Sequence, residues 1–514
     1  MKKIIYMASM LLAMSFTSCE DFLTVSSPDK LTTNRFWRNE KDVQAGMASA
    51  YAQLYHGDAW ATSEVRWPTE AYRTDLYELG QDAINYDTWT DLYKFTYTNG
   101  NTQFSYYYQD LYRGINFVNQ VIYHLPHVPA EGISDERRAL LTSEAHFLRG
   151  YYHMMLLLNW KDIIIRDEYI QNDDQINKGL SNRVACWDFV VAELLKATEA
   201  LPAERSTDEL GRATSGAAYS YLGFAYLTRA YEESAKKDDF LAKAIDALNH
   251  VKGYELVGGE ELINMFNGRN KNCKESIFEV QYTKNTANGA RYNSCIHFWI
   301  AAAELGGWDE IIPNQILMNE YLKEGEIATT GRYDSRLYNT IYFDCDYFND
   351  GTGRVIGMEY KDRFNNEDAD GNPVYYNRPV FRKFTAATLE EMDEGRCAFN
   401  IPLMRYANVL LMKAEVLNLQ GNQAAAIELI NQVRSKHGDM PAMTGSSFDE
   451  VQAQIEHERI IEFPLESYRW YDMRRWGKLK EVLHSQGRTN FTVGRDEFYP
   501  IPLWEITSNT SLQK

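Results

Sequence analysis

Helical periodicity covers most of this 514-residue chain and is interrupted over residues 253–400. On either side of the interruption, apolar side chains recur every three or four residues, which places them on one face of a helix. Two stretches are typical of antiparallel helix pairs with small residues at the contact, as in tetratricopeptide-like units. The first sets Ala218, Tyr221, Leu222 and Ala225 against Leu241, Ala244, Ile245 and Leu248, and the second sets Leu410, Ala414 and Leu417 against Ala426, Leu429, Ile430 and Val433.

The interruption predicts a long irregular insert. Residues 253–400 are rich in Gly, Asn, Asp and Tyr, and alternating runs such as Phe278, Val280 and Tyr282 predict short strands. We therefore predict a mainly α fold, in which tetratricopeptide-like helical pairs carry a loop-rich insert with short strands. Long loops on rigid helices often hold functional sites.

Two helix ends can be predicted from single residues. Ser134 is a suitable N-cap for a long helix that continues past Leu141 and Leu148. A second helix is expected to end before Pro202, because proline cannot continue a helix. Its apolar face is Trp187, Val190, Val191, Leu194, Leu195 and Leu201.

The N-terminus has the pattern of a secretory signal. Lys2 and Lys3 precede an apolar run that ends at Phe16, and small residues then lead to Cys19. A cysteine directly after the expected cleavage point is typical of bacterial lipoproteins, so Cys19 is the predicted site of lipid (palmitate) attachment. Several acyl chains would anchor the protein durably, since each buried methylene contributes about 0.8 kcal/mol. The alternative is an ordinary secreted protein with an incidental Cys19.

Charge and cysteine content exclude several classes of function. The formal net charge is −19, and loss of Lys2 and Lys3 with the signal would lower it by two more. Nucleic acid is not an expected partner, because phosphate binding needs a basic surface. The same charge would be repelled by anionic lipid, so the anchor must hold the protein to a membrane. The six cysteines are scattered without a CxxC pair, which argues against a zinc site or a disulfide scaffold.

Two loop-like segments combine aromatic and polar side chains in a way that suits sugar binding. They run from Trp67 to Trp89 and from Arg291 to Glu310. A pyranose ring offers an apolar face that packs on Trp or Tyr, and its hydroxyl rim needs planar polar partners. Trp299 stands between Phe298 and Ile300, which favours a place in the core.

Two further motifs have a structural and a functional interpretation. The arginine-rich block 469–475 is interpreted as ion pairs that close the C-terminal segment onto the helices, rather than as an anion site; Arg469 and Asp472 are spaced to pair along one helix face. Asn366 to Gly371 resemble the start of a calcium loop, but the twelfth position is Asn377 instead of glutamate. An acidic surface turn is therefore expected there.

Motifs for catalysis are weak. The sequence has no GxSxG or HExxH motif, and His146 and His153 share a helix face, where packing is the expected role. A glycosidase needs two carboxyl groups roughly 5–10 Å apart, which a sequence alone cannot place. We therefore predict a binding protein that is not an enzyme and uses no cofactor or metal.

Several motifs along the chain resemble the SusD/RagB family of outer-membrane nutrient-binding lipoproteins. The most specific motif lies near the C-terminus, and the others are spread over nearly the whole chain after Cys19. They are Ser27 to Leu31, Phe36-Trp37, Glu144 to Tyr152, Gly211 to Thr214, Glu458 to Phe463, Tyr468 to Gly477 and Tyr499 to Pro502.

This resemblance implies a SusD-like fold and a role in nutrient uptake. It implies a signal peptide at 1–18, a tether at 19–35, an N-terminal helical region at 36–252 and a C-terminal SusD/RagB region at 253–514. The implied protein sits on the cell surface by a lipid anchor in the outer membrane. It binds an oligosaccharide without cleaving it and delivers it to a SusC-like TonB-dependent transporter.

The resemblance also implies that ligand contacts come from the two aromatic segments. On that basis the predicted contacts are Arg73, Asp75, Trp89, Tyr292 and Trp308, with buried packing as the alternative for each. Three other functions stay open. They are capture of a peptide or another nutrient on the same scaffold, secreted glycoside hydrolase activity, and a purely structural role beside the transporter.

Overall fold

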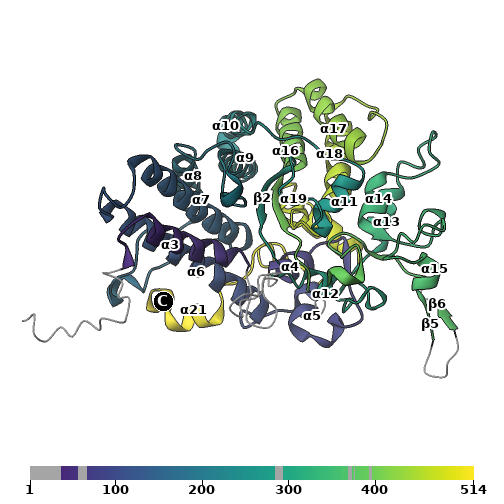
Figure 1. Cartoon of the computed structure of the whole chain (residues 1–514), viewed down its shortest axis with the longest axis horizontal. Coiled ribbons are helices and arrows are strands. Elements are labelled where there is room, and N and C mark those ends of the chain that lie inside the picture. Colours follow the sequence, from purple (N-terminus) through teal and green to yellow (C-terminus); the bar gives the residue numbers. More distant parts are fainter. Residues whose placement is uncertain are drawn as a thin grey trace, which may run out of the picture.

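The computed structural model describes residues 36–55, 66–283, 293–367, 373–375, 377–392 and 396–513. Cys19, Tyr292 and residues 368–371 of the expected acidic turn lie outside these ranges. The fold is mainly helical, with a few two-stranded ladders, as predicted (Figure 1). Within the described ranges, no helix is long and apolar enough to span a bilayer.

The N-terminal part is a set of helices packed in sequence order. Its long helices are α3 (Glu40–Ala52), α6 (Thr102–His124), α7 (Asp135–Asn159), α8 (Arg183–Ala197), α9 (Ser215–Glu232) and α10 (Lys237–Asn249). The first predicted helix pair is confirmed as α9 and α10. Gly223 of α9 allows their close approach, because a Cβ there would lie 2.5 Å from the side chain of Leu248.

Helix ends follow the predicted signals with one correction. The Ser134 hydroxyl accepts a hydrogen bond from the Arg137 N–H at 3.2 Å and caps α7 as expected. Helix α8 ends at Ala197, and its face from Trp187 to Leu194 is buried. Leu195, expected on that face, is 46% exposed. One residue advances about 100° around a helix, so Leu195 turns away from α7 where Leu194 faces it.

The C-terminal part repeats the helix-pair arrangement. Its helices are α16 (Tyr406–Leu419), α17 (Gln423–His437), α18 (Phe448–Glu462), α19 (Arg469–Arg475), α20 (Leu479–Ser485) and α21 (Leu503–Ser508). The second predicted pair is confirmed as α16 and α17. Gly421, with a φ of 82°, makes the turn between them in a backbone region that glycine adopts without strain.

The insert contains short helices that its sequence did not predict. These are α11 (Glu260–Asn267), α12 (Ile296–Ile300), α13 (Gln315–Leu322), α14 (Ser335–Thr340) and α15 (Tyr360–Arg363). Helices of this length are marginal alone and depend on tertiary packing. The expected short strands are present as β2 (Ser276–Val280), β3 (Ile311–Pro313), β4 (Ile341–Tyr342), β5 (Asn365–Glu367), β6 (Pro373–Tyr375) and β7 (Val380–Phe381).

Two antiparallel ladders tie distant parts of the chain together. Strand β2 pairs with β8 (Ile401–Arg405), so that Ser276 faces Arg405. Strand β1 (Tyr77–Leu79), which lies between α4 (Arg66–Ala71) and α5 (Asp87–Lys94), pairs with β3, so that Tyr77 faces Pro313. The second ladder fixes the N-terminal region to the insert.

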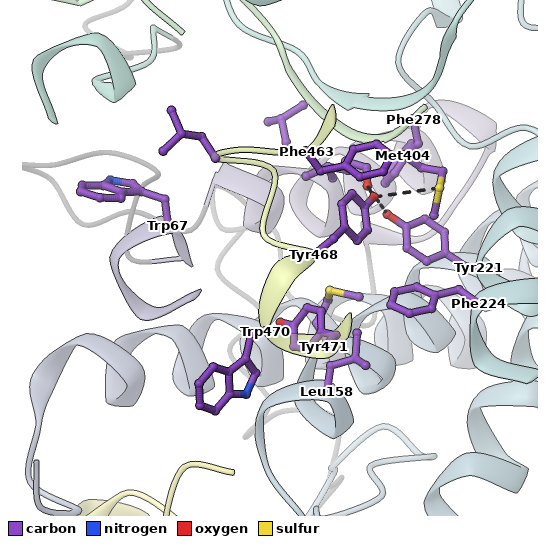
Figure 2. Close-up of a cluster of buried hydrophobic side chains, with 14 of the residues drawn as sticks. Trp67, Leu158, Tyr221, Phe224, Phe278, Met404, Phe463, Tyr468, Trp470 and Tyr471 are labelled. Atoms are coloured by element: carbon purple, nitrogen blue, oxygen red, sulfur yellow. Dashed lines mark hydrogen bonds between the residues drawn. The ribbon is translucent and has the colours of Figure 1, made fainter. Parts of the chain in front are cut away.

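A buried aromatic cluster joins the C-terminal segment to the helices (Figure 2). Tyr468 and Tyr221 both donate hydrogen bonds from their hydroxyls to the Leu403 carbonyl, at 2.5 and 3.1 Å. Trp470 and Tyr471 of α19 continue the cluster toward Leu158 of α7. Helix α19 is therefore held in the interior by both apolar and polar contacts.

The arginine-rich block consists of buried structural ion pairs, as interpreted. Asp472 pairs with Arg459 at 2.7 Å and with Arg475, and Arg475 also pairs with Glu415 at 2.5 Å. Arg469 does not pair with Asp472, as the spacing had suggested, but with Asp75 at 2.6 Å. The buried carboxylate of Asp472 already has two guanidinium partners, and Arg469 lies on the side of α19 that faces the segment of Asp75.

Candidate ligand-binding site

The structure brings the two predicted aromatic segments together. The β1–β3 ladder aligns them, and the Gly80 N–H donates to the Glu310 carbonyl at 2.9 Å. The Tyr72 hydroxyl donates to the same carbonyl at 2.8 Å. A side chain at Gly80 would collide with the Asp309 carbonyl, 1.6 Å from the Cβ position, so glycine is needed for this close approach.

Four tryptophans from these segments form a continuous cluster, which we call the tryptophan cluster (Trp67, Trp89, Trp299 and Trp308). Ring centroids are 6.0 Å apart between Trp67 and Trp89, and 5.0 Å apart between Trp89 and Trp299. Trp299 and Trp308 are also 5.0 Å apart, at nearly perpendicular planes. These edge-to-face contacts add about 0.5–1.5 kcal/mol each beyond the burial of area.

Exposure increases along the tryptophan cluster. Trp67 and Trp89 are 6% and 5% exposed, whereas Trp308 is 36% exposed. Trp299, expected in the core, is half-buried between Trp89 and Trp308. The ring of Tyr86 is tilted against that of Trp89, with centroids 4.9 Å apart, and Tyr86 is 44% exposed. The most exposed rings are therefore Tyr86, which is backed by Trp89, and Trp308, which is backed by Trp299 and has one face stacked on Phe298.

Charged groups fix the backbone around Trp308. Asp309 has a φ of 58° and pairs with Arg378 at 2.6 Å, and Arg378 also lies 3.5 Å from Glu304. Burial raises the pKa of Asp309, and Arg378 partly offsets that rise. The Arg378 side chain is 21% exposed, so it is a polar group within reach of a ligand beside Trp308.

Glu310 lies in a different environment from its neighbours. Its side chain is fully buried, and burial together with the nearby carboxylate of Asp82 raises its pKa to about 9. The carboxyl group is therefore protonated at neutral pH. A protonated carboxyl can be buried beside Asp82 without the large penalty of a buried charge.

Arg73 and Asp75 have structural partners in the interior. The Arg73 guanidinium lies 4.6 Å from the ring centroids of both Trp470 and Tyr499, and it donates to the Asn159 side chain. Asp75 pairs with Arg469. Each of the two side chains is 1% exposed, so a ligand outside the protein does not reach them in this structure. Ligand contact by these two residues, and by Tyr292, stays a prediction.

The predicted contact set therefore contains one well-exposed ring, Trp308, among its described members. Tyr86 and Arg378 are accessible but were not chosen from the sequence. Tyr86 lies in the first predicted aromatic segment, so the sequence did indicate its region as a candidate site. Arg378 follows the expected acidic turn, and nothing in its local sequence indicated that it would approach Trp308.

The histidine clusters of the described residues act as ion pairs. His437 lies between Glu275 and Glu462, at 3.0 and 2.9 Å, and Arg405 contacts the same two carboxylates. Burial lowers the pKa of His437, but the two carboxylates outweigh it and raise the pKa to about 9. In this structure the imidazole and the Arg405 guanidinium balance the two carboxylates as buried ion pairs. His153 is fully buried, as packing predicts, whereas His146 is half-buried and its Nδ1 lies 2.7 Å from the Glu193 carboxylate between α7 and α8.

Comparison with known proteins agrees with this architecture. The model of the SusD family matches residues 274–514, and a model described as "Starch-binding associating with outer membrane" matches residues 21–227. SusD-like protein P2 of Formosa agariphila is 25% identical over 98% of this chain and 97% of its own length.

Solved structures show the same fold. A SusD superfamily protein from Bacteroides vulgatus superposes with a TM-score of 0.77 at 25% identity, covering 92% of this chain and 98% of its own. Surface glycan-binding protein A from Bacteroides thetaiotaomicron, solved with laminarihexaose, has a TM-score of 0.71 at 18% identity, with coverage of 92% and 98%. With the two family models spanning most of its length, this chain belongs to the SusD/RagB family.

Proposed function

We propose that this protein captures an oligosaccharide at the cell surface and delivers it, without cleaving it, to a SusC-like TonB-dependent transporter of the outer membrane. The observation that carries the proposal is the tryptophan cluster, which is buried at Trp67 and exposed at Trp308. A rigid, partly exposed indole with a polar rim is the arrangement that stacks on the apolar face of a sugar. Such platforms lose little conformational entropy when they bind.

Related proteins support a carbohydrate ligand. One solved structure with a TM-score of 0.72 is described as a laminarin-binding SusD-like protein, and another was solved with laminarihexaose. The description of the family model that matches residues 21–227 supports a place at the outer membrane. The lipobox ending at Cys19 supports a lipid anchor as the means of attachment.

The carboxyl groups near Trp308 favour binding over hydrolysis. A glycosidase acid must reach the glycosidic oxygen, but Glu310 is fully buried. Asp309 is 2% exposed and is neutralised by Arg378. Neither group is placed to donate a proton to a sugar outside the surface.

Replacement of Trp308 by alanine tests the binding site. We expect Trp308→Ala to weaken oligosaccharide binding about fivefold or more, because removing a stacked ring costs about 1–3 kcal/mol of binding energy. The measurement is calorimetry with laminarihexaose and a panel of plant and microbial oligosaccharides.

Trp504 provides a matched control, since it is 40% exposed but lies on α21. Trp504→Ala should bind like the wild type. Equal losses in both variants would refute a site at Trp308, and binding of peptides but not sugars would favour the peptide alternative. Release of reducing ends by the purified protein would establish hydrolysis instead.

A further inference from the structure

A polar cavity of about 230 Å³ is lined by residues of α11, of the junction of α14 with β4, and of the segment that follows β7. We call it the arginine pocket, and its polar lining includes Asn264, Arg269, Asn339, Tyr342, Arg354 and Arg382. It shares no residue with the tryptophan cluster. The pocket thus gathers three positively charged guanidinium groups in a chain whose formal net charge is −19.

Arg382 differs from the other two arginines because no carboxylate neutralises it. Its backbone N–H donates to the Thr340 carbonyl at 2.8 Å, and its Nη1 donates to the Tyr338 carbonyl at the same distance. Among the described residues, no acidic side chain lies within ion-pair distance of its guanidinium, and Nε and Nη2 have no acceptor. A half-buried guanidinium with donors to spare is a site for an anion.

The Arg382 side chain is held in place before any ligand arrives. Its guanidinium carbon lies 5.4 Å from the ring centroid of Tyr342 and 5.7 Å from that of Phe348. These rings and the bond to Tyr338 restrict its rotamers, so little entropy remains to be lost on binding. The two remaining donors form a fork, which matches two oxygens of a carboxylate or a sulfate.

Neutral donors stand beside this fork. The side chains of Asn339 and Tyr342 have no hydrogen-bond partner in the described part of the chain, and both line the arginine pocket. Amide and phenol groups of this kind bind sugar hydroxyls. The volume is below the roughly 300–1,000 Å³ of pockets that enclose drug-sized ligands, and it suits a single sugar ring.

The other charges at the pocket are already balanced. Arg354 pairs with Asp350 at 2.9 Å, and Arg269 pairs with Glu391 at 2.7 Å. Lys383, which also lines the cavity, is buried and pairs with Glu466 at 2.5 Å. Glu260 also lines the cavity, but it is solvent-exposed at the first residue of α11, where the helix N-terminus favours a negative charge. Arg382 therefore carries the positive charge that a ligand would meet inside the pocket.

We propose that the arginine pocket is a second ligand site that binds the anionic substituent of a sugar, a carboxylate or a sulfate ester, with Arg382 as its main contact. Anion binding in the arginine pocket does not depend on the proposed function. Only the expectation that the anion is attached to a sugar rests on it. The protein would then select acidic glycans, with the tryptophan cluster stacking on one ring and the arginine pocket holding a charged one.

The test compares wild type with Arg382→Gln by calorimetry on four probes. These are trigalacturonic acid, a galactose 6-sulfate oligosaccharide, free galacturonic acid and neutral laminarihexaose. We expect the variant to bind at least one anionic probe tenfold or more weakly and to bind laminarihexaose within twofold of wild type. The probe that loses affinity distinguishes a carboxylate from a sulfate ligand.

Arg113→Gln is the control for charge, since Arg113 is an exposed arginine on α6, and it should leave every affinity unchanged. Arg382→Lys keeps the charge without the fork and should show an intermediate loss, which separates ligand binding from misfolding. Equal binding of both anionic oligosaccharides by wild type and Arg382→Gln, or no binding of any anionic probe by wild type, would overturn the arginine pocket. Binding of free galacturonic acid without any oligosaccharide would retain the pocket and refute the proposed function.

Discussion

Trp308 and Glu310 are two residues apart and occupy opposite environments. The ring of Trp308 is 36% exposed, whereas the carboxyl of Glu310 is fully buried beside Asp82. Asp309 turns the backbone between them with a positive φ and is held by Arg378. Three consecutive residues thus present an exposed ring and bury an acid next to it.

This arrangement makes stability depend on pH through Glu310. Its folded pKa of about 9 lies above the ordinary value near 4.5, so folding retains a proton that the unfolded chain releases. Stability from this group is complete below pH 4.5 and is lost as the pH rises toward 9. We expect Glu310→Gln to unfold at the same denaturant concentration as wild type at pH 4 and to be up to about 5 kcal/mol more stable at pH 8. Parallel curves for the two proteins across this range would contradict the prediction.

At the residue scale, the sequence predicted segments better than individual contacts. Both aromatic segments, which were selected by their composition, meet in the structure. Arg73 and Asp75 look like polar neighbours of a sugar site, but their partners Trp470 and Arg469 lie about 400 residues away and enclose them. Burial that depends on such distant partners leaves no local signal.

Helix α19 shows how an element can be fixed by buried charges. Arg469 at its first position pairs with Asp75 of the N-terminal region, and Asp472 pairs with Arg459 of α18. Removing one partner of a buried pair leaves an uncompensated charge, which is more costly than the pair itself is favourable. The ion pairs therefore specify where the C-terminal segment docks.

Asp75→Ala tests this role. We expect the free energy of unfolding to fall by about 3–5 kcal/mol, because the Arg469 guanidinium would stay buried without its partner. Denaturant unfolding followed by tryptophan fluorescence measures the change. Asp239→Ala breaks the exposed pair with Lys243 on α10 and should change stability by less than about 0.5 kcal/mol. If Asp75→Ala instead loses sugar affinity with no loss of stability, Asp75 is a ligand contact.

The sequence predicted helices correctly where the hydrophobic periodicity extends over many residues. It missed helices where the periodicity covers only a few residues. The helix pairs α9–α10 and α16–α17 follow from small and apolar residues at regular spacing, and Ser134 caps α7 as its side chain indicates. Helices α11 to α15 have four to eight residues each, too few for a clear period, and they form because neighbouring elements cover them.

Across the whole molecule, a buried ion cluster (Glu275, Arg405, His437 and Glu462) joins the insert, β8, α17 and α18. His437 contacts both carboxylates, and Arg405 reaches Glu466 as well, at 2.7 Å. The His437 imidazolium therefore links parts of the chain that are up to 187 residues apart, from Glu275 to Glu462.

The folded pKa of His437, about 9, lies above the ordinary value of 6.5. The folded protein therefore holds this proton more tightly, and its stabilising effect is complete below pH 6.5 and is lost as the pH rises through 9. We expect wild type to exceed His437→Gln in unfolding free energy by up to about 3 kcal/mol more at pH 6 than at pH 10. A constant difference between the two proteins over that range would show that His437 is neutral in the folded state.

One further consequence follows from the backbone at Asp309. Its left-handed conformation is one that asparagine, aspartate and glycine tolerate best, while branched residues are strained there. Few residue types can therefore replace Asp309 without strain, whether or not its side chain touches a sugar. A family member with valine or isoleucine at this position would be expected to present the neighbouring indole differently.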